Sequence, residues 1–290
     1  MYVEGRRCDG LPAARNLGVE FAKGDAIFFL DDDTLLDRDV IDELSNFLRN
    51  NKTALGVEPF SVGGRKLLAN KLSSGKVWNT LAKILMLPYR EKDRLRVRRS
   101  GESVFPSSLT SPILAQRFHG YAMCYRASVF KKYSFDTNFK RSGYLEDLDF
   151  SYRVQKGNPN SLYAIPHGKV VHNISPESRM HADLRAQMIT VYRFYFFFKH
   201  KSHESILNMP AFLLAQLGHI IEVTIKSAMG RSRQDTWELI YFLQSYILAF
   251  RNLRDILKAD LKFFNNKVTA TSRPLYQRSK KRDGPQKSII

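Results

Sequence analysis

A short apolar segment that leads directly into a cluster of acidic residues constrains this chain most. Residues 26–30 read Ala-Ile-Phe-Phe-Leu, follow a Gly-Asp pair, and are followed by Asp31, Asp32 and Asp33. A short, continuous apolar run bounded in this way is typical of a strand that is buried on both faces of a sheet. The acids then lie at the carboxyl end of the strand, which is the edge where open α/β sheets bind ligands.

Neighbouring carboxylates at such an edge repel one another unless a cation or hydrogen-bond donors offset their charge. Mg²⁺ and Mn²⁺ are commonly held by one or two carboxylates together with phosphate oxygens of a substrate, so the cluster indicates a metal site for a nucleotide diphosphate. The alternative is structural. Asp33 or Thr34 would cap the helix that follows, and Asp37 and Asp39 would favour its dipole. The acids taken alone leave both interpretations open.

The charge of the chain indicates an anionic partner. Its 290 residues include 46 Lys and Arg against 28 Asp and Glu, which gives a formal net charge of +18. Nucleic acid, a phospholipid surface and phosphorylated substrates all fit this balance, and charge alone does not choose among them. The two cysteines, Cys8 and Cys124, provide neither a disulfide framework nor zinc-type spacing, so we expect a reducing compartment.

Helix and strand signals alternate in the first part of the chain. Residues 13–21 read as a short helix ahead of the strand at 26–30. Residues 40–48 have apolar side chains at the spacing of an amphipathic helix, and residues 54–57 read as another strand. This order predicts an α/β domain with a mostly parallel sheet and crossover helices.

Several short motifs, in this order and spacing, resemble those of family 2 glycosyltransferases with the GT-A fold. The resemblance extends over residues 10–175 and favours the metal interpretation of the Asp-x-Asp pattern at 31–33. The motifs are Ala-Arg-Asn-Leu-Gly at 14–18, Lys-Gly-Asp at 23–25, Phe-Leu-Asp-Asp-Asp at 29–33, Gly-Tyr-Ala-Met at 120–123, Phe-Asp-Thr-Asn-Phe at 135–139, Glu-Asp-Leu-Asp at 146–149 and Val-Val-His at 170–172.

The resemblance implies a Rossmann-like, mostly parallel sheet that lacks its usual beginning. Family members start with strand-helix units that carry much of the nucleotide-binding pocket, whereas Met1 stands just before the Ala-Arg-Asn motif. We therefore expect an N-terminally truncated GT-A domain. A start assigned too late, a part supplied by another chain, or a decayed copy would each account for the difference.

The resemblance also implies roles for individual residues. Asp33 would be the main ligand of Mg²⁺ or Mn²⁺, with Asp31 and His172 beside it and Asp31 also directed toward the donor ribose. Asp147 would be the general base that takes the proton of the acceptor hydroxyl. The structural alternatives are a helix start with acids in its first turn at 146–149, and a surface histidine at the end of a strand. Residues expected to bind or orient the substrates are Arg15, Asp31, Glu146, Asp149 and Arg153.

Beyond residue 178 the chain changes character. Aromatic residues at 192–198 stand beside Lys199, and residues 211–229 read as an amphipathic helix with too many charged groups to span a bilayer. We expect these helices to lie in an anionic membrane surface, and the alternative is a small helical subdomain packed on the sheet. The predicted organisation is a partial GT-A domain at 1–178, an amphipathic helical region at 179–262 and a basic, disordered tail at 263–290.

The resulting hypothesis is an inverting glycosyltransferase, peripheral to the cytoplasmic face of the cell membrane. It would move a sugar from a nucleotide-diphosphate donor to a hydroxyl of a glycan or lipid-linked acceptor in the cell envelope. The basic segment at 90–99 would be a solvated loop or part of the acceptor side. The alternative function is a decayed, non-catalytic partner protein. Nucleic acid is not an expected partner, because the chain has no recognised basic-aromatic module and its acidic strand ends would repel phosphates without a metal.

Overall fold

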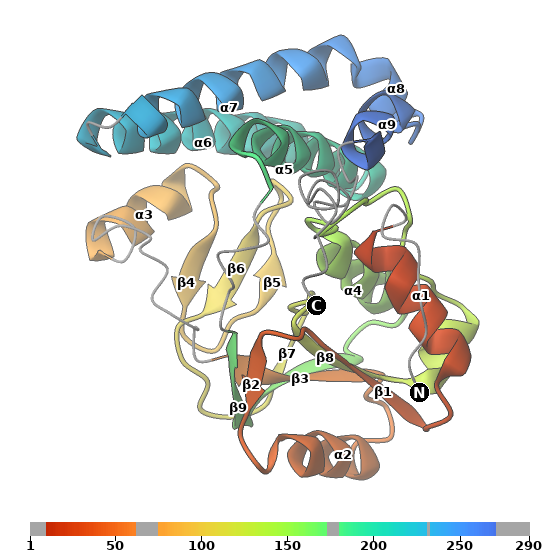
Figure 1. Cartoon of the computed structure of the whole chain (residues 1–290). Coiled ribbons are helices and arrows are strands. Elements are labelled where there is room, and N and C mark those ends of the chain that lie inside the picture. The colour runs from red at the N-terminus through yellow and green to blue at the C-terminus, as the bar shows by residue number, and fades with distance from the viewer. Residues whose placement is uncertain (1–9, 62–74, 173–179, 231–232, 271–290) are drawn as a thin grey trace, which may run out of the picture.

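The computed structural model describes residues 10–61, 75–172, 180–230 and 233–270. A main sheet lies between helices in the lower part of the view in Figure 1, with a smaller sheet beside it. A layer of helices from the C-terminal part of the chain lies at the top of the view, above the smaller sheet and away from the main sheet. The predicted α/β class with a helical C-terminal part is therefore confirmed.

The main sheet is mixed rather than mostly parallel. Its strands are β1 (Ala26–Leu30), β2 (Thr34–Leu36), β3 (Gly56–Ser61), β7 (Ile113–Leu114), β8 (Ala122–Arg126) and β9 (Leu162–His172). They follow the order β1-β8-β3-β9-β2, and β7 also pairs with β9. Only β3 and β9 are parallel neighbours among these described strands. The prediction of a mostly parallel sheet is therefore wrong.

The position of β8 explains the difference. β1 and β3 run in the same direction, as expected for strands connected through helix α2 (Val40–Asn50), but β8 lies between them and is antiparallel to both. The order of local signals along the chain does not reveal this partner, because antiparallel and parallel neighbours can be distant in sequence. β1 is at one end of the described strand order and its Leu30 is 44% exposed, so the expected burial on both faces is also wrong.

Helices cover both faces of the main sheet. On one face, α2 buries Val40, Leu44 and Leu48 against strand residues, as the four-residue spacing predicts. The other face contacts α4 (Glu146–Gly157), whose Phe150 stacks on Phe135 with ring centroids 4.1 Å apart. The helices on this second side are α1 (Leu11–Phe21), the 3₁₀ helix η2 (Ala127–Lys131) and α4 (Glu146–Gly157).

The smaller sheet includes the basic segment. It has the order β4-β6-β5, with β4 (Tyr89–Glu91), β5 (Arg96–Val97) and β6 (Ser103–Pro106), and α3 (Lys76–Ile84) lies next to it. Arg98 donates hydrogen bonds of 2.6 to 3.0 Å to the carbonyl oxygens of Ala82, Lys83 and Leu87. The predicted loop at 90–99 is thus partly strand, and Arg98 ties it to the end of α3.

The helical layer has an aromatic core. It consists of α5 (Ala182–Phe196), the π-helix η3 (Phe197–Lys201), α6 (Asn208–Gly230), α7 (Arg233–Arg251), α8 (Leu253–Leu257) and α9 (Lys262–Ala270). Tyr192, Phe194 and Phe197 are no more than 2% exposed and pack among these helices. These aromatic side chains therefore build a packed subdomain and are not available to contact a membrane.

The structure also bears on the predicted disordered tail and on membrane-spanning helices. The predicted start of the tail at residue 263 is too early, because Phe264 and Val268 of α9 are fully buried in the helical core. Residues 271–290 of that predicted tail lie outside the described residues. Among the helices described here, none combines the length and the apolar character needed to cross a membrane.

Candidate active site

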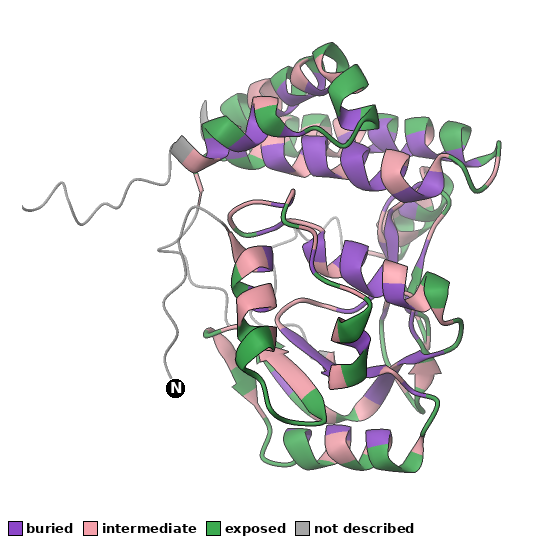
Figure 2. Cartoon of the chain, turned by 90° about the vertical axis from the view of Figure 1, so that its right-hand side faces the viewer, coloured by how far each residue is buried: buried purple, intermediate pink, exposed green. Residues whose placement is uncertain are grey.

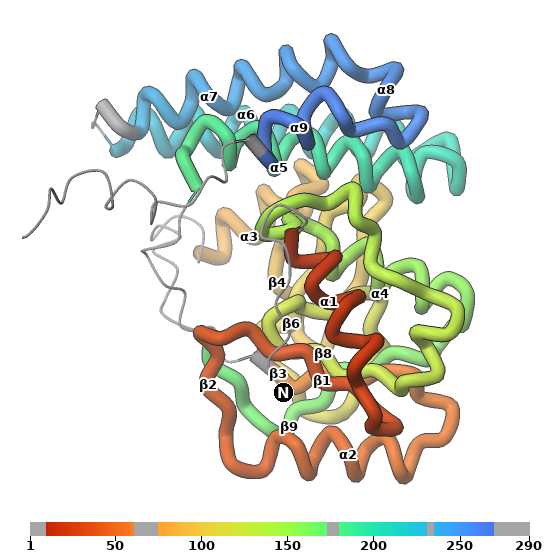
Figure 3. Tube along the Cα trace, turned by 45° about the vertical axis from the view of Figure 1, so that its right-hand side comes forward, coloured from red at the N-terminus to blue at the C-terminus, as the bar shows by residue number. Residues whose placement is uncertain are grey.

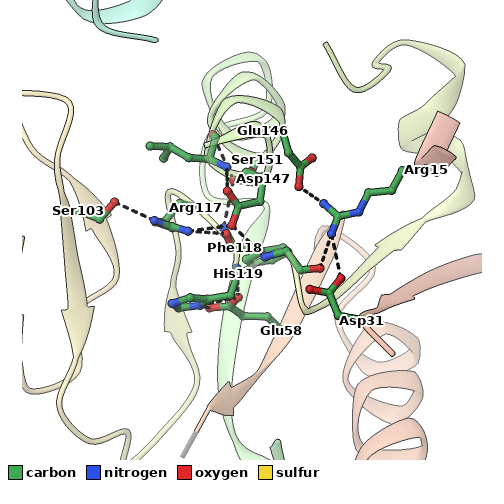
Figure 4. Close-up of polar contacts among 12 residues, drawn as sticks. Arg15, Asp31, Glu58, Ser103, Arg117, Phe118, His119, Glu146, Asp147 and Ser151 are labelled. Atoms are coloured by element: carbon green, nitrogen blue, oxygen red, sulfur yellow. Dashed lines mark hydrogen bonds and ion pairs between the residues drawn. The ribbon is translucent and has the colours of Figure 1, made fainter. Parts of the chain in front are cut away.

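A cavity of about 350 Å³ lies where the main sheet, the smaller sheet and the helices meet. Its walls come from α1, the ends of β1 and β8, the strand β6 and the first turn of α4. Figure 4 shows the polar contacts around it. Residues that line it include Arg15, Asp31, Ser103, Phe105, Arg117, Tyr121, Glu146 and Asp147.

Arg15 connects three segments of the chain at the cavity wall. Its Nη2 atom donates to the carbonyl oxygen of Gly120 at 2.7 Å and lies 3.4 Å from Oδ1 of Asp31. Its Nη1 atom pairs with Glu146 of α4. The side chain is 6% exposed, because α1 packs this face against the sheet. Arg15 therefore holds the end of β1 and the start of α4 at a fixed separation.

Asp147 is held by three donors at the first turn of α4. Its Oδ2 accepts hydrogen bonds from Nη2 of Arg117 at 3.0 Å and from the backbone N–H of Gly120 at 2.9 Å. Its Oδ1 accepts from the N–H of Leu148 at 2.7 Å. A carboxylate in a first helical turn is also favoured by the helix dipole. These contacts orient Asp147 toward the cavity, and the side chain remains 18% exposed.

Glu146 is the buried neighbour of Asp147. Burial raises the pKa of Glu146 to about 8, although the charge of Arg15 acts in the opposite direction. Its second carboxyl oxygen, Oε2, is buried and has no hydrogen-bond partner within the described part of the chain. Glu146 thus offers one free oxygen at the cavity wall, where a polar group of a ligand would satisfy it.

Asp31, Asp33 and His172 form a cluster beside the cavity. One potential ligand atom from each residue lies within 4.8 Å of the others, and Nε2 of His172 is 2.9 Å from Oδ1 of Asp33. The pairing of β2 with β9 brings the end of β9 next to the acids, with Thr34 opposite His172. Tyr121 stacks on the imidazole with centroids 4.6 Å apart.

The cluster has the donor set of a divalent-cation site. Carboxylate oxygens suit Mg²⁺ and Mn²⁺, and a neutral imidazole suits Mn²⁺-like ions. Burial raises the pKa of Asp31 more than the nearby Arg15 and His172 lower it, and Asp33 contributes to the rise. A bound divalent cation would favour the ionised carboxylate instead. The residues present therefore fit a metal ion.

The alternative in which Asp33 or Thr34 caps the following helix is wrong. Residues 34–36 form the strand β2, and the helix α2 begins only at Val40. Asp39 occupies the position before this helix, and its side chain makes no capping hydrogen bond. Asp33 is thus separated from the helix by a strand and lies against His172 instead.

The structure does not bring Asp149 and Arg153 to the cavity wall. Asp149 is fully buried, with Nζ of Lys199 and Nε2 of His200 each 2.7 Å from Oδ1 and Nε of Arg153 2.9 Å from Oδ2. Arg153 also donates to the carbonyl oxygen of Ser134 at 2.7 Å. These contacts join α4 to the π-helix, whereas the predicted substrate roles required exposure to a ligand.

Other residues of the cavity were not singled out from the sequence. Arg117 stands three residues before the Gly-Tyr-Ala-Met motif, and no spacing pattern marks it. Glu102 also lines the cavity and lies 2.7 Å from Nε2 of His219 in α6 and 3.2 Å from Nε of Arg193 in α5. Both positions depend on contacts between distant segments, so local sequence gives no signal for them.

A comparison with known protein families finds a match in the first part of the chain. The model described as "Glycosyl transferase family 2" matches residues 2–108. This match agrees with the resemblance to family 2 glycosyltransferases over the part of the chain that it covers. No curated protein matches the chain.

Several solved structures are similar at low sequence identity. GalNAc-T7 with UDP, GalNAc and Mn²⁺ has 17% identity and a TM-score of 0.43, and the match covers 65% of this chain but only 36% of that one. S. aureus TarS 1-349 has 12% identity, a TM-score of 0.45 and coverages of 94% and 72%. The mannosyltransferase PcManGT from Pyrobaculum calidifontis, in complex with GDP-Man and Mn²⁺, has 16% identity, a TM-score of 0.39 and coverages of 93% and 67%.

Proposed function

We propose that this chain is an inverting glycosyltransferase that moves a sugar from a nucleotide-diphosphate donor to an acceptor hydroxyl. The observation that carries the proposal is the arrangement around Arg15. On one side, Asp31 belongs to a cluster suited to a divalent cation, and on the other side Asp147 lines the same cavity as a fixed carboxylate. This arrangement separates a diphosphate end from a proton-accepting end within one site.

At the diphosphate end, Asp31, Asp33 and His172 are the residues that would hold Mg²⁺ or Mn²⁺. When bound, the ion supplies positive charge that stabilises the leaving diphosphate. Arg15 also contributes at this end, because its ion pair with Asp31 keeps that carboxylate at the edge of the cavity. The donor is then positioned with its anomeric carbon toward Asp147.

At the acceptor end, Asp147 removes the proton as the new bond forms. The acceptor oxygen bonds to the anomeric carbon, the bond from that carbon to the diphosphate oxygen breaks, and the proton moves to the carboxylate of Asp147. A single displacement of this kind inverts the anomeric configuration. Arg117 and the N–H of Gly120 fix the carboxylate, so that little reorganisation is needed during the reaction.

The proposed acceptor is a glycan or a lipid-linked saccharide at the cytoplasmic face of the cell membrane, where the protein is peripheral. Two properties support this location. The net charge of +18 favours an anionic surface, and α6 and α7 expose large apolar side chains to solvent. Nucleic acid is not proposed, because acidic side chains line the cavity and no nucleic-acid module is recognised in the sequence.

The rival function is a non-catalytic partner that keeps the fold. The retained geometry of Asp147, Asp33 and His172 favours an enzyme, since a protein without activity has no need to hold these groups in place. The decisive experiment incubates the full chain with a panel of nucleotide-diphosphate sugars and Mn²⁺ and measures transfer to saccharide and lipid-linked acceptors. Transfer that disappears in both Asp147→Asn and Asp33→Asn supports the proposal. Absence of transfer from every donor, or transfer that both variants retain, contradicts it.

A further inference from the structure

Helix α6 presents an uncharged stripe to solvent. Met209, Leu213 and Leu217 are 36%, 53% and 53% exposed, and their four-residue spacing places them on one face. Ile206, just before the helix, is 90% exposed. The ionisable side chain in residues 208–221 is His219, which is buried and turned toward Glu102. The outer face of this part of α6 therefore has no charge.

Helix α7 presents a matching stripe. Leu243, Ile247 and Phe250 are 42%, 52% and 56% exposed and recur at spacings of four and three residues. Residues 239–250 contain no Asp, Glu, Lys, Arg or His. Monomeric proteins rarely leave contiguous apolar patches of this kind without a partner.

The two stripes belong to neighbouring helices on the side of the molecule away from the main sheet. α6 and α7 run beside each other in Figures 1 and 3, and the hydroxyl of Tyr246 donates to Oε1 of Gln216 at 3.1 Å between them. Figure 2 shows buried and exposed segments alternating along the helices of this layer, as expected for helices with one covered and one uncovered face. The residues that we call the outer apolar surface are Met209, Leu213, Leu217, Leu243, Ile247 and Phe250.

We infer that the outer apolar surface docks on an anionic lipid bilayer, with the helices lying in the plane of the membrane. Charge complementarity selects this occupant. At the end of α7 and beyond it, Arg251, Arg254, Lys258 and Lys262 are exposed and outnumber Asp255 and Asp260. Basic side chains beside an apolar helix face are attracted to anionic headgroups while the apolar side chains enter the acyl boundary.

A second copy of the chain is a poorer occupant of the same surface. Each chain has a formal charge of +18, and association of two such chains would bring these charges together. An anionic leaflet carries charge of the opposite sign, so the same positive charges attract the chain to it. Arg251 follows Phe250 directly along the chain, and the exposed Arg254 stands at the start of the next helix, α8.

The inference rests on the proposed membrane-surface function and adds a consequence for the acceptor. Helix α6 contributes the outer apolar surface on one face and, on the other, His219, which lies 2.7 Å from the cavity residue Glu102. One helix, about 10–12 Å across with its side chains, therefore separates the lipid contact from a wall of the cavity. An acceptor anchored in the leaflet needs only a short reach to the site, which favours a lipid-linked acceptor.

The test measures vesicle binding, so its result does not depend on catalysis. The full chain is sedimented with vesicles of phosphatidylcholine and with vesicles of an equimolar mixture of phosphatidylcholine and phosphatidylglycerol. We expect Leu213→Glu/Ile247→Glu to weaken partitioning onto the mixed vesicles by about tenfold or more, because apolar side chains are withdrawn from lipid. The matched control is Phe21→Glu/Ile41→Glu, which places two charges at exposed apolar positions of α1 and α2.

A second pair of variants tests the charge. Arg251→Gln/Arg254→Gln should weaken binding to the mixed vesicles by about thirtyfold and leave weak binding to phosphatidylcholine unchanged, since each of the two basic residues near the surface contributes on the order of 1 kcal/mol. Thermal unfolding and sedimentation velocity establish that each variant is folded and report its oligomeric state.

Equal binding of wild type and Leu213→Glu/Ile247→Glu overturns the inference. So does a wild-type dimer without vesicle affinity that Leu213→Glu/Ile247→Glu converts to a monomer. Vesicle binding by a chain without transferase activity would instead leave the inference standing and remove the proposed function.

Discussion

The guanidinium of Arg117 lies 3.0 Å from Oδ2 of Asp147, although 30 residues separate them in the sequence. Arg117 is itself buried and donates from its other terminal nitrogen to Oγ of Ser103 at 3.1 Å. The smaller sheet thereby supports the position of the carboxylate at the start of α4. The proposed base is thus oriented by a residue of another segment, and not by its own helix alone.

Replacement of Asp147 tests the proposed base. Asp147→Asn keeps the size of the side chain and removes its ability to take a proton, so kcat should fall by at least about a hundredfold. Donor affinity should stay nearly unchanged, because the lost interaction belongs to the transition state. Steady-state kinetics and donor titration provide both quantities. Asp42→Asn, at an exposed position of α2, is the matched control. If Asp147→Asn stays within a few-fold of wild type while Glu146→Gln abolishes turnover, the base is another acid.

Replacement of Asp33 tests the metal site. Asp33→Asn removes one negative ligand, and donor binding in the presence of Mn²⁺ should weaken to the level seen after chelation. The neighbouring Asp32 is exposed and lies outside the cluster with His172, so Asp32→Asn should bind donor as wild type does. Calorimetric titration with Mn²⁺ alone gives a readout that does not require activity. Unchanged Mn²⁺ affinity in Asp33→Asn would exclude this residue as a main ligand.

Replacement of Asp149 should affect stability rather than catalysis. Asp149→Asn leaves the cations of Lys199 and Arg153 without their buried partner, which typically costs about 3–5 kcal/mol of unfolding free energy. Urea denaturation measures this loss, and the exposed-site variant Asp42→Asn should change stability by no more than about 0.5 kcal/mol. A stable Asp149→Asn protein that no longer binds substrate would instead support the role predicted from the sequence.

Acid should weaken the contact between the cavity and the helical layer. Burial tends to raise the pKa of Glu102, but the charges of Arg193 and His219 outweigh it and hold the pKa at about 2. Because the pKa is lower in the folded state, this carboxylate stabilises the fold above its ordinary pKa of about 4.3, and the contribution is lost as the pH falls from there toward 2. Melting temperatures should therefore fall less steeply over this range in Glu102→Gln than in wild type. Glu238→Gln, at an exposed position, should keep the wild-type slope. An identical slope in wild type and Glu102→Gln would contradict the prediction.

Local pattern in the sequence was sufficient for the elements that position the diphosphate end of the site. The spacing of Val40, Leu44 and Leu48 predicted α2, and the apolar run at 26–30 predicted β1 with the acids at its end. These features depend on residues a few positions apart, since a helix repeats its face every three to four residues and a short strand ends at its turn signals. The family motifs also predicted that Asp33 and His172, which are distant in sequence, belong to one candidate metal site.

Tertiary structure alone decided the features that join distant segments. The insertion of β8 between β1 and β3 made the sheet mixed, and the burial of Tyr192 and Phe197 made a helical core from residues that suited a membrane surface. In the same way, Asp149 became part of an internal ion-pair cluster. A strand's partner, an aromatic side chain's environment and a carboxylate's counter-ion all depend on which surfaces meet when the chain packs. The sequence by itself determines which surfaces each element has, whereas packing determines which of them remain exposed to a ligand or a membrane.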